Sequence, residues 1–323
     1  MIYAGIDLGG TGIKAALATE EGRILGKKQC PTGASREWPF IMKDMCTLIR
    51  ELAAERGVPL DEIGGVGLGV PGLADPDTGE LVYAPNLPGC RHVPAAEFVR
   101  KELSLPLFIG NDANVAALGE SLWGAGRGNM RCTVLITLGT GVGGGVIING
   151  SIFSGAYHGG AELGHMVIHK DGERCGCGRK GCWEVYASAT GLIRNAKRTM
   201  QLTPDSLLWK LCGGDPEAVD GRIVGQAVDA GDEAAVRVME TYLDDLAIGL
   251  GNVYNIFQPE ILIIGGGISG RGEKLAAPLR ERLKKEIYGG DASKLDLRIA
   301  ELGNDAGVLG ACALAMRNMK EKA

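Results

Sequence analysis

Residues 6–12 read Ile-Asp-Leu-Gly-Gly-Thr-Gly, and residues 136–142 read Ile-Thr-Leu-Gly-Thr-Gly-Val. An apolar stretch that favours a β-strand lies before and after each of these glycine turns. The two stretches therefore predict the same strand–turn–strand unit twice in one chain. A repeated unit of this kind indicates two lobes with a common origin.

Outward from the turns, short apolar runs alternate with amphipathic stretches, which is typical of an α/β protein. Strands are predicted at residues 2–7, 13–17, 23–29, 66–70, 107–109, 133–138, 145–148 and 261–264. Helices are predicted over 36–56, from Pro94, after Asp112, around 236–250 and from about Ala306. We expect a first lobe of residues 1–110 and 306–323, to which the last helix crosses back, and a second lobe of residues 111–305. Residues 201–222 give no clear pattern.

The composition excludes several classes of protein. The chain has 323 residues, enough for two lobes that each bury a core. Its 34 basic and 39 acidic side chains give a net charge of −5 without a basic run, so neither nucleic acid nor a membrane is an expected partner. Residues 132–161 are uncharged but contain nine glycines, which favours buried strands over a membrane helix. The early Asp7 and the absence of a basic leader predict no signal peptide and a cytoplasmic protein.

The glycine turns are candidates for binding a nucleotide phosphate chain. Gly9 and Gly10 lack Cβ atoms, so backbone N–H groups can approach a phosphate, Thr11 can add a hydroxyl, and Asp7 can hold Mg²⁺ through water. A plain β-hairpin would also use glycines for its turn. The second turn, at residues 139–141, favours the phosphate interpretation because turn geometry alone does not require the repetition.

Two further motifs follow predicted strands. Gly265–Gly267 could pass close to a nucleoside or could simply form a strand-to-helix turn. Asn111 and Asp112 lie between a strand and a helix. Asp112 could accept the proton of a substrate hydroxyl, as an aspartate does in phosphoryl transfer, or either residue could serve only as the helix N-cap.

Three of the nine cysteines are clustered. Cys175, Cys177 and Cys182, together with His165, have the composition of a closed tetrahedral Zn²⁺ site, although a redox thiol cluster is the alternative. Glu162 and Glu184 flank the cluster. They could hydrogen-bond the hydroxyls of a polyol next to His165, or they could be solvated loop charges.

These residues together resemble the ROK family of sugar kinases and related repressors, over essentially the whole chain. The resemblance rests on residues 7–11, 70–72, 85–87, 110–114, 137–145, 162–165 and 175–184. The Glu-x-Gly-His run and the cysteine run are its most specific parts. Gly12 departs from the lysine that many members carry after Gly-Gly-Thr, which leaves the backbone cradle intact.

The resemblance implies an actin-like, two-lobed ATPase fold of the ribonuclease H-like type with a zinc-binding loop. It implies ATP-dependent phosphorylation of glucose at the 6-hydroxyl, with Asp112 as the catalytic base. The implied sugar-binding residues are Gly72, Asn86, Asn111, Asp112, Glu162, His165 and Glu184. The implied ATP-binding residues are Asp7, Gly9, Gly10, Thr11, Gly139, Thr140, Gly141, Gly266 and Gly267. The implied zinc ligands are His165, Cys175, Cys177 and Cys182.

Other members of the family leave alternatives open. The same sugar contacts serve kinases for N-acetylmannosamine, N-acetylglucosamine and fructose. A sugar-sensing repressor is disfavoured because Asp7 leaves no room for a preceding DNA-binding domain. A homodimer is expected, since dimers are usual in the family.

Overall fold

The computed structural model describes residues 1–289 and 292–322, so Ala323, the end of the predicted first lobe, lies outside the described residues. The chain forms two compact units. Unit 1 comprises Met1–Leu135, Gly145–Ala161 and Glu301–Ala323, and unit 2 comprises Ile136–Gly144 and Glu162–Ala300. No helix among the described residues is both long enough and apolar enough to cross a membrane.

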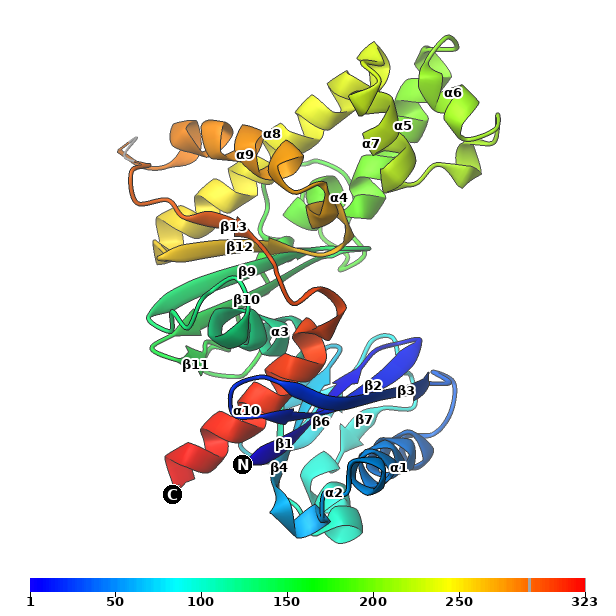
Figure 1. The fold of residues 1–323 in the computed structure, drawn as a ribbon. Helices are drawn as coiled ribbons and strands as arrows, with labels where there is room; N and C mark the ends of the chain where they lie inside the picture. The colour runs from blue at the N-terminus through cyan, green and yellow to red at the C-terminus, as the bar shows by residue number, and fades with distance from the viewer. Residues whose placement is uncertain (290–291, 323) are drawn as a thin grey trace. The chain divides into compact units, whose positions relative to one another are not determined.

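Unit 1 is built on a five-stranded sheet with the order β3-β2-β1-β4-β8. Figure 1 labels β1 to β4 of this sheet. Its strands are β1 (Ile2–Leu8), β2 (Gly12–Thr19), β3 (Ile24–Pro31), β4 (Ile63–Val70) and β8 (Leu107–Asn111). Its helices are α1 (Trp38–Arg56), α2 (Ala95–Leu103), α3 (Asp112–Trp123) and α10 (Ala306–Lys322). A small sheet of β5 (Leu73–Asp75), β6 (Glu80–Tyr83) and β7 (Arg91–Val93) follows β4 in the chain.

Alternation along the strands determines which helix covers which face of this sheet. Ile6 is fully buried in one hydrophobic core with Ile41 of α1. Its neighbour Gly5 points to the opposite face, where a Cβ atom would lie 2.2 Å from the backbone oxygen of Val308 in α10. The glycine therefore lets α10 pack directly on the backbone of β1.

The second sheet repeats the pattern of the first, with the order β11-β10-β9-β12-β13. Its strands are β9 (Cys132–Leu138), β10 (Val142–Ile148), β11 (Ser151–Ile152), β12 (Ile261–Gly265) and β13 (Leu297–Ile299). In each sheet the first hairpin contains a glycine turn, the third strand along the chain pairs with the hairpin's second strand, and the fourth pairs with its first strand. The repeat predicted from residues 6–12 and 136–142 is thus present in the sheet topology.

The helices of unit 2 all lie in the sequence between β11 and β13. They are α4 (Trp183–Ala187), α5 (Ala189–Leu202), α6 (Leu207–Leu211), α7 (Gly221–Asp229), α8 (Glu233–Phe257) and α9 (Glu273–Glu286). The region 201–222, which gave no clear pattern, contains the short helix α6 and a 3₁₀ turn at Pro216–Ala218. Short helices of this kind are too brief to produce a readable period.

The predicted boundary at residue 110 differs from the division in the structure, where unit 1 continues to Leu135 and includes residues 145–161. The reason is the packing of α3 on α10. A Cβ atom on Gly310 would lie 1.9 Å from the backbone oxygen of Val115, and one on Gly119 would lie 2.8 Å from the backbone nitrogen of Gly310. This close helix crossing holds α3 in unit 1, and no sequence linker marks it.

A buried carboxylate secures the return of the chain to unit 1. Glu120 in α3 has 0% of its surface exposed. Its oxygens accept hydrogen bonds from the backbone N–H groups of Ala125 (3.0 Å), Glu301 (3.1 Å) and Leu302 (2.8 Å). One charged side chain therefore joins the end of α3 to the segment that precedes α10.

Candidate active site and metal centre

The first glycine turn is held by hydrogen bonds from Thr32. The hydroxyl of the fully buried Thr32 donates to the Gly9 oxygen (2.6 Å), and the Thr32 N–H donates to the Thr11 oxygen (3.1 Å). Within the turn the Gly9 N–H donates to the Gly12 oxygen (2.9 Å). A Cβ atom on Gly10 would lie 3.5 Å from Cβ of Asn86, so the structure brings this predicted sugar residue beside the turn.

Asp7, the predicted Mg²⁺ residue, lies at the end of β1 opposite Lys14 of β2. The Lys14 ammonium is 3.4 Å from the Asp7 carboxylate. A Cβ atom on Gly307 would lie 2.7 Å from Cγ of Asp7, so this glycine allows the first turn of α10 to approach the carboxylate. The sequence did not point to Lys14 as a partner of Asp7. Lys14 lies two residues after Gly12 in β2, so these two residues lie on the same face of that strand.

The second glycine turn is held by the segment that contains α4 and the start of α5. The Ala189 N–H donates to the Gly139 oxygen (2.9 Å), and the Thr190 hydroxyl donates to the Thr140 oxygen (2.8 Å). The Val142 N–H donates to Oε2 of Glu184 (3.1 Å). Three hydrogen bonds therefore hold this turn. One is at the Thr140 carbonyl, one is at Gly139 before it, and one is at Val142 after it.

The third glycine motif lies against the second turn. Gly266 has φ = 87°, and a Cβ atom there would lie 2.4 Å from the backbone oxygen of Leu138, which directly precedes the turn. Both the left-handed backbone and the close approach require glycine at this position. A Cβ atom added to Gly267 would meet no atom within 4 Å, so the surroundings of this residue are open.

The two interpretations of Asn111 and Asp112 separate in the structure. Asn111 is the N-cap of α3, because its Oδ1 accepts from the N–H groups of Ala113 (3.0 Å) and Asn114 (3.3 Å). Its Nδ2 donates to the Gly72 oxygen (3.1 Å), which brings these two predicted sugar residues together. Asp112 is the half-buried first residue of the helix, and its Oδ1 accepts from the Ala113 N–H (2.8 Å).

In unit 2, the predicted sugar residues lie around the cysteine loop. Exposed Glu162 precedes a 3₁₀ turn, Leu163–His165, that carries half-buried His165. Glu184 lies in α4, where Oε2 contacts Val142 and Oε1 lies 3.6 Å from Sγ of Cys175. Glu184 thus connects the cysteine loop to the second glycine turn, a contact that its sequence position did not reveal.

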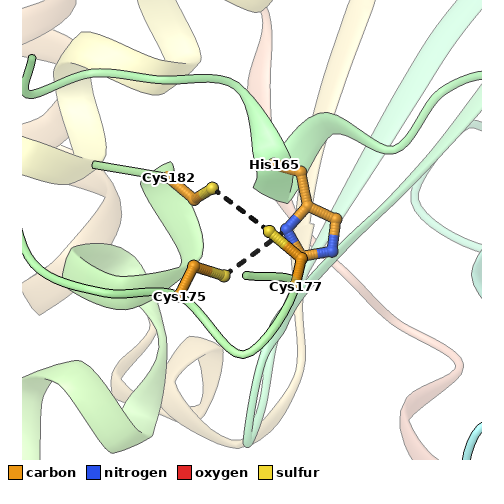
Figure 2. Close-up of side chains that lie close together, drawn as sticks. All are labelled: His165, Cys175, Cys177 and Cys182. Carbon is orange, nitrogen blue, oxygen red and sulfur yellow. Dashed lines mark hydrogen bonds between the residues drawn. The ribbon is translucent and has the colours of Figure 1, made fainter. Parts of the chain in front are cut away.

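The four predicted zinc ligands converge in the structure (Figure 2). Their ligand atoms all lie within 4.8 Å of one another. Sγ of Cys175 is 3.7 Å from Nδ1 of His165, and Sγ of Cys177 is 3.7 Å from Sγ of Cys182. A tetrahedral Zn²⁺ with ligands at its usual bond lengths would separate neighbouring ligand atoms by about 3.3–3.8 Å. The donor set and its spacing therefore fit zinc.

The thiols of this cluster have different surroundings. Burial raises the pKa of Cys175 to about 12 and also raises the pKa of Cys182. A hydrogen bond from the backbone of Arg179 lowers the pKa of the exposed Cys177. Buried thiols that resist ionisation are poor redox groups, whereas a bound metal supplies the positive charge that stabilises their thiolates. The convergence of an imidazole with three thiols is the observation that favours a metal over a redox cluster.

Comparison with known proteins identifies the family and agrees with the fold. The family model described as "ROK family" matches residues 3–318. A glucokinase of Thermotoga maritima is 37% identical over 310 residues, which cover 96% of each chain. A ROK family glucokinase of Streptomyces griseus, solved in complex with glucose and AMPPNP, is 35% identical with a TM-score of 0.81, covering 98% of this chain and 100% of that one. A ROK hexokinase of Thermus thermophilus is 32% identical with a TM-score of 0.84, covering 99% and 100%.

These similarities define a phosphotransferase of the hexokinase type with the actin-like sugar kinase fold. The α/β fold expected from the two glycine turns is thereby confirmed. The chain belongs to the ROK family.

Proposed function

We propose that the protein transfers the γ-phosphoryl group of ATP to the 6-hydroxyl of glucose, giving glucose 6-phosphate and ADP. The observation that carries the proposal is that Asn111 and Asp112 have different positions at the start of α3. Asn111 performs the capping, so Asp112 is not needed as the cap and can serve as the base. An aspartate in this role accepts the hydroxyl proton as the phosphoryl group is transferred, and its position matters more than a raised pKa.

The remaining residues position the two substrates. The proposed sugar contacts are Gly72, Asn86, Asn111, Glu162, His165 and Glu184. Backbone N–H groups of the two glycine turns bind the phosphates, and the loop at Gly266 and Gly267 lies at the nucleoside. Mg²⁺ bound to ATP would neutralise phosphate charge, and Asp7 would hold its water ligands.

The zinc centre has a structural role in this proposal. His165, Cys175, Cys177 and Cys182 would hold the ion, which stabilises the loop. Nδ1 of His165 lies 3.7 Å from Sγ of Cys175, so a bound ion would fix the orientation of the His165 ring through this nitrogen, and Nε2 would remain for a sugar hydroxyl. Nothing in the reaction passes through the metal.

We propose glucose as the sugar substrate because the relatives named above are similar to this chain. Two of them are named glucokinase, and one was solved with glucose and AMPPNP. The second candidate is an N-acetylated hexose, whose acetamido group would have to fit beside Glu162, His165 and Glu184.

The test of the proposed chemistry is Asp112→Asn, which keeps the shape and the hydrogen bonding but removes the proton acceptor. We expect the turnover number with glucose and ATP to fall by about 10²-fold or more. Glucose affinity, measured by calorimetry, should change far less. Turnover near the wild-type value would show that Asp112 is not the base.

A further inference from the structure

Both glycine turns are held by hydrogen bonds to their backbone carbonyl oxygens. In unit 1, Thr32 donates to the oxygens of Gly9 (2.6 Å) and Thr11 (3.1 Å). In unit 2, Ala189 donates to the oxygen of Gly139 (2.9 Å) and Thr190 to that of Thr140 (2.8 Å). In each unit a threonine hydroxyl is one of the two donors. Each turn is thus held by one threonine hydroxyl and one backbone N–H, although not at the same pair of carbonyls.

Peptide geometry converts this anchoring into a direction for the N–H groups. In a planar trans peptide, the C=O and the following N–H point in opposite directions, and no described peptide bond is cis. The Gly139 and Thr140 carbonyls both point toward the start of α5. The N–H groups of Thr140 and Gly141 consequently point away from α5, in the arrangement of an anion-binding nest.

We propose that Thr190 is a positioning residue for ATP, because its hydroxyl holds the Thr140 carbonyl and thereby directs the Gly141 N–H toward a phosphate. This inference rests on the proposed function, in which ATP phosphates bind the second turn. Thr32 also holds the first turn, although at the carbonyls of Gly9 and Thr11. Both threonines act through the backbone of the turn and not by contact with a substrate.

The segment that carries Thr190 also carries part of the cysteine loop. Cys182 is the N-cap residue of α4, Glu184 contacts the Val142 N–H (3.1 Å), and Ser188 caps α5 by accepting from the Gly191 N–H (3.1 Å). The residues that hold the turn therefore belong to one continuous segment, which contains α4 and the start of α5. Thr190 itself is exposed, so its hydroxyl can be removed without opening a core cavity.

The experiment compares Thr190→Ala with Thr190→Ser in the full-length protein. Affinity for AMPPNP is measured by calorimetry, and KM for ATP, KM for glucose and kcat are measured separately. Loss of a neutral hydrogen bond predicts AMPPNP binding and KM for ATP weakened by about 3- to 10-fold in Thr190→Ala. Thr190→Ser should restore both, and KM for glucose should not change. Thr241→Ala is the matched control, since its hydroxyl donates to a backbone carbonyl of Arg237 (3.1 Å) in the same unit.

Wild-type affinity for AMPPNP in Thr190→Ala would overturn the inference, and so would an equal rise in both KM values. A further variant separates this failure from that of the proposed function. Gly141→Ala would place a Cβ atom 2.3 Å from Oε2 of Glu184 and disturb the turn itself. If Gly141→Ala weakens AMPPNP binding and Thr190→Ala does not, only the positioning role is wrong. If neither weakens it, ATP does not bind this turn.

Discussion

Replacement of Glu120 by glutamine tests whether one buried carboxylate secures the return of the chain into unit 1. The side chain accepts three backbone hydrogen bonds, two at Oε2 from Ala125 and Glu301 and one at Oε1 from Leu302. Glutamine has one acceptor oxygen. In its best orientation it keeps the two bonds at the Oε2 position and turns its NH₂ group toward the Leu302 N–H.

The expected cost follows from these contacts. The orphaned Leu302 N–H costs about 1–3 kcal/mol, and the two remaining hydrogen bonds each lose about 1 kcal/mol of charge assistance. Removal of a buried charge recovers part of its desolvation free energy. We therefore expect the free energy of unfolding to fall by about 2–3 kcal/mol, which corresponds to a Tm lower by about 4–12 °C.

The assay is urea unfolding followed by circular dichroism and tryptophan fluorescence, with Glu62→Gln as the control. Glu62 is an exposed glutamate of the same unit. Its replacement should leave the midpoint within error of the wild type, since surface substitutions change stability by about 0.5 kcal/mol or less. Equal midpoints for Glu120→Gln and Glu62→Gln would refute the reasoning.

Three further changes have definite expected outcomes. Cys177→Ser should lose zinc by elemental analysis, raise KM for glucose and lower the Tm, and full activity with no change in metal content would contradict the structural role of the site. Gly266→Ala places a Cβ atom on a left-handed backbone and against Leu138, so we expect the free energy of unfolding to fall by about 2 kcal/mol or more and ATP affinity to fall. A wild-type Tm would argue against this close approach. Gly249→Ala would drive a Cβ atom to 2.0 Å from the ring of the fully buried Trp183, and overpacking of this kind should cost about 1–3 kcal/mol in urea unfolding, with a red shift of the tryptophan emission as the local marker.

The sequence revealed the features whose signals are local. The strands beside both glycine turns are continuous apolar runs, and their predicted bounds agree with β1, β2, β9 and β10 to within three residues. The candidate metal cluster was also predictable, because three cysteines within eight residues with bracketing glycines form a local pattern. The structure adds that the ligand atoms of these cysteines and of His165 converge to within 4.8 Å of one another.

Features that depend on distant contacts were not predictable. Thr190 lies fifty residues from the carbonyl that it holds, and Glu120 lies 181 and 182 residues from two of its donors. The division between the units depends on the crossing of α3 and α10, where Gly310 permits contact with the Val115 backbone. The strands β5 to β7 are three or four residues long, too short for alternation to be detected.

The central claim is that this hexokinase-type enzyme uses glucose as its sugar and ATP as its donor. A coupled assay with the purified protein and ATP should compare glucose, N-acetylglucosamine, N-acetylmannosamine and fructose under identical conditions. A site that hydrogen-bonds specific hydroxyls rejects analogues that leave its polar groups unpaired, so we predict that kcat/KM for glucose exceeds the others by roughly 10²-fold or more. Glucose 6-phosphate and ADP should form in equal amounts. A comparable or higher kcat/KM for either N-acetylated hexose would contradict the assignment of glucose.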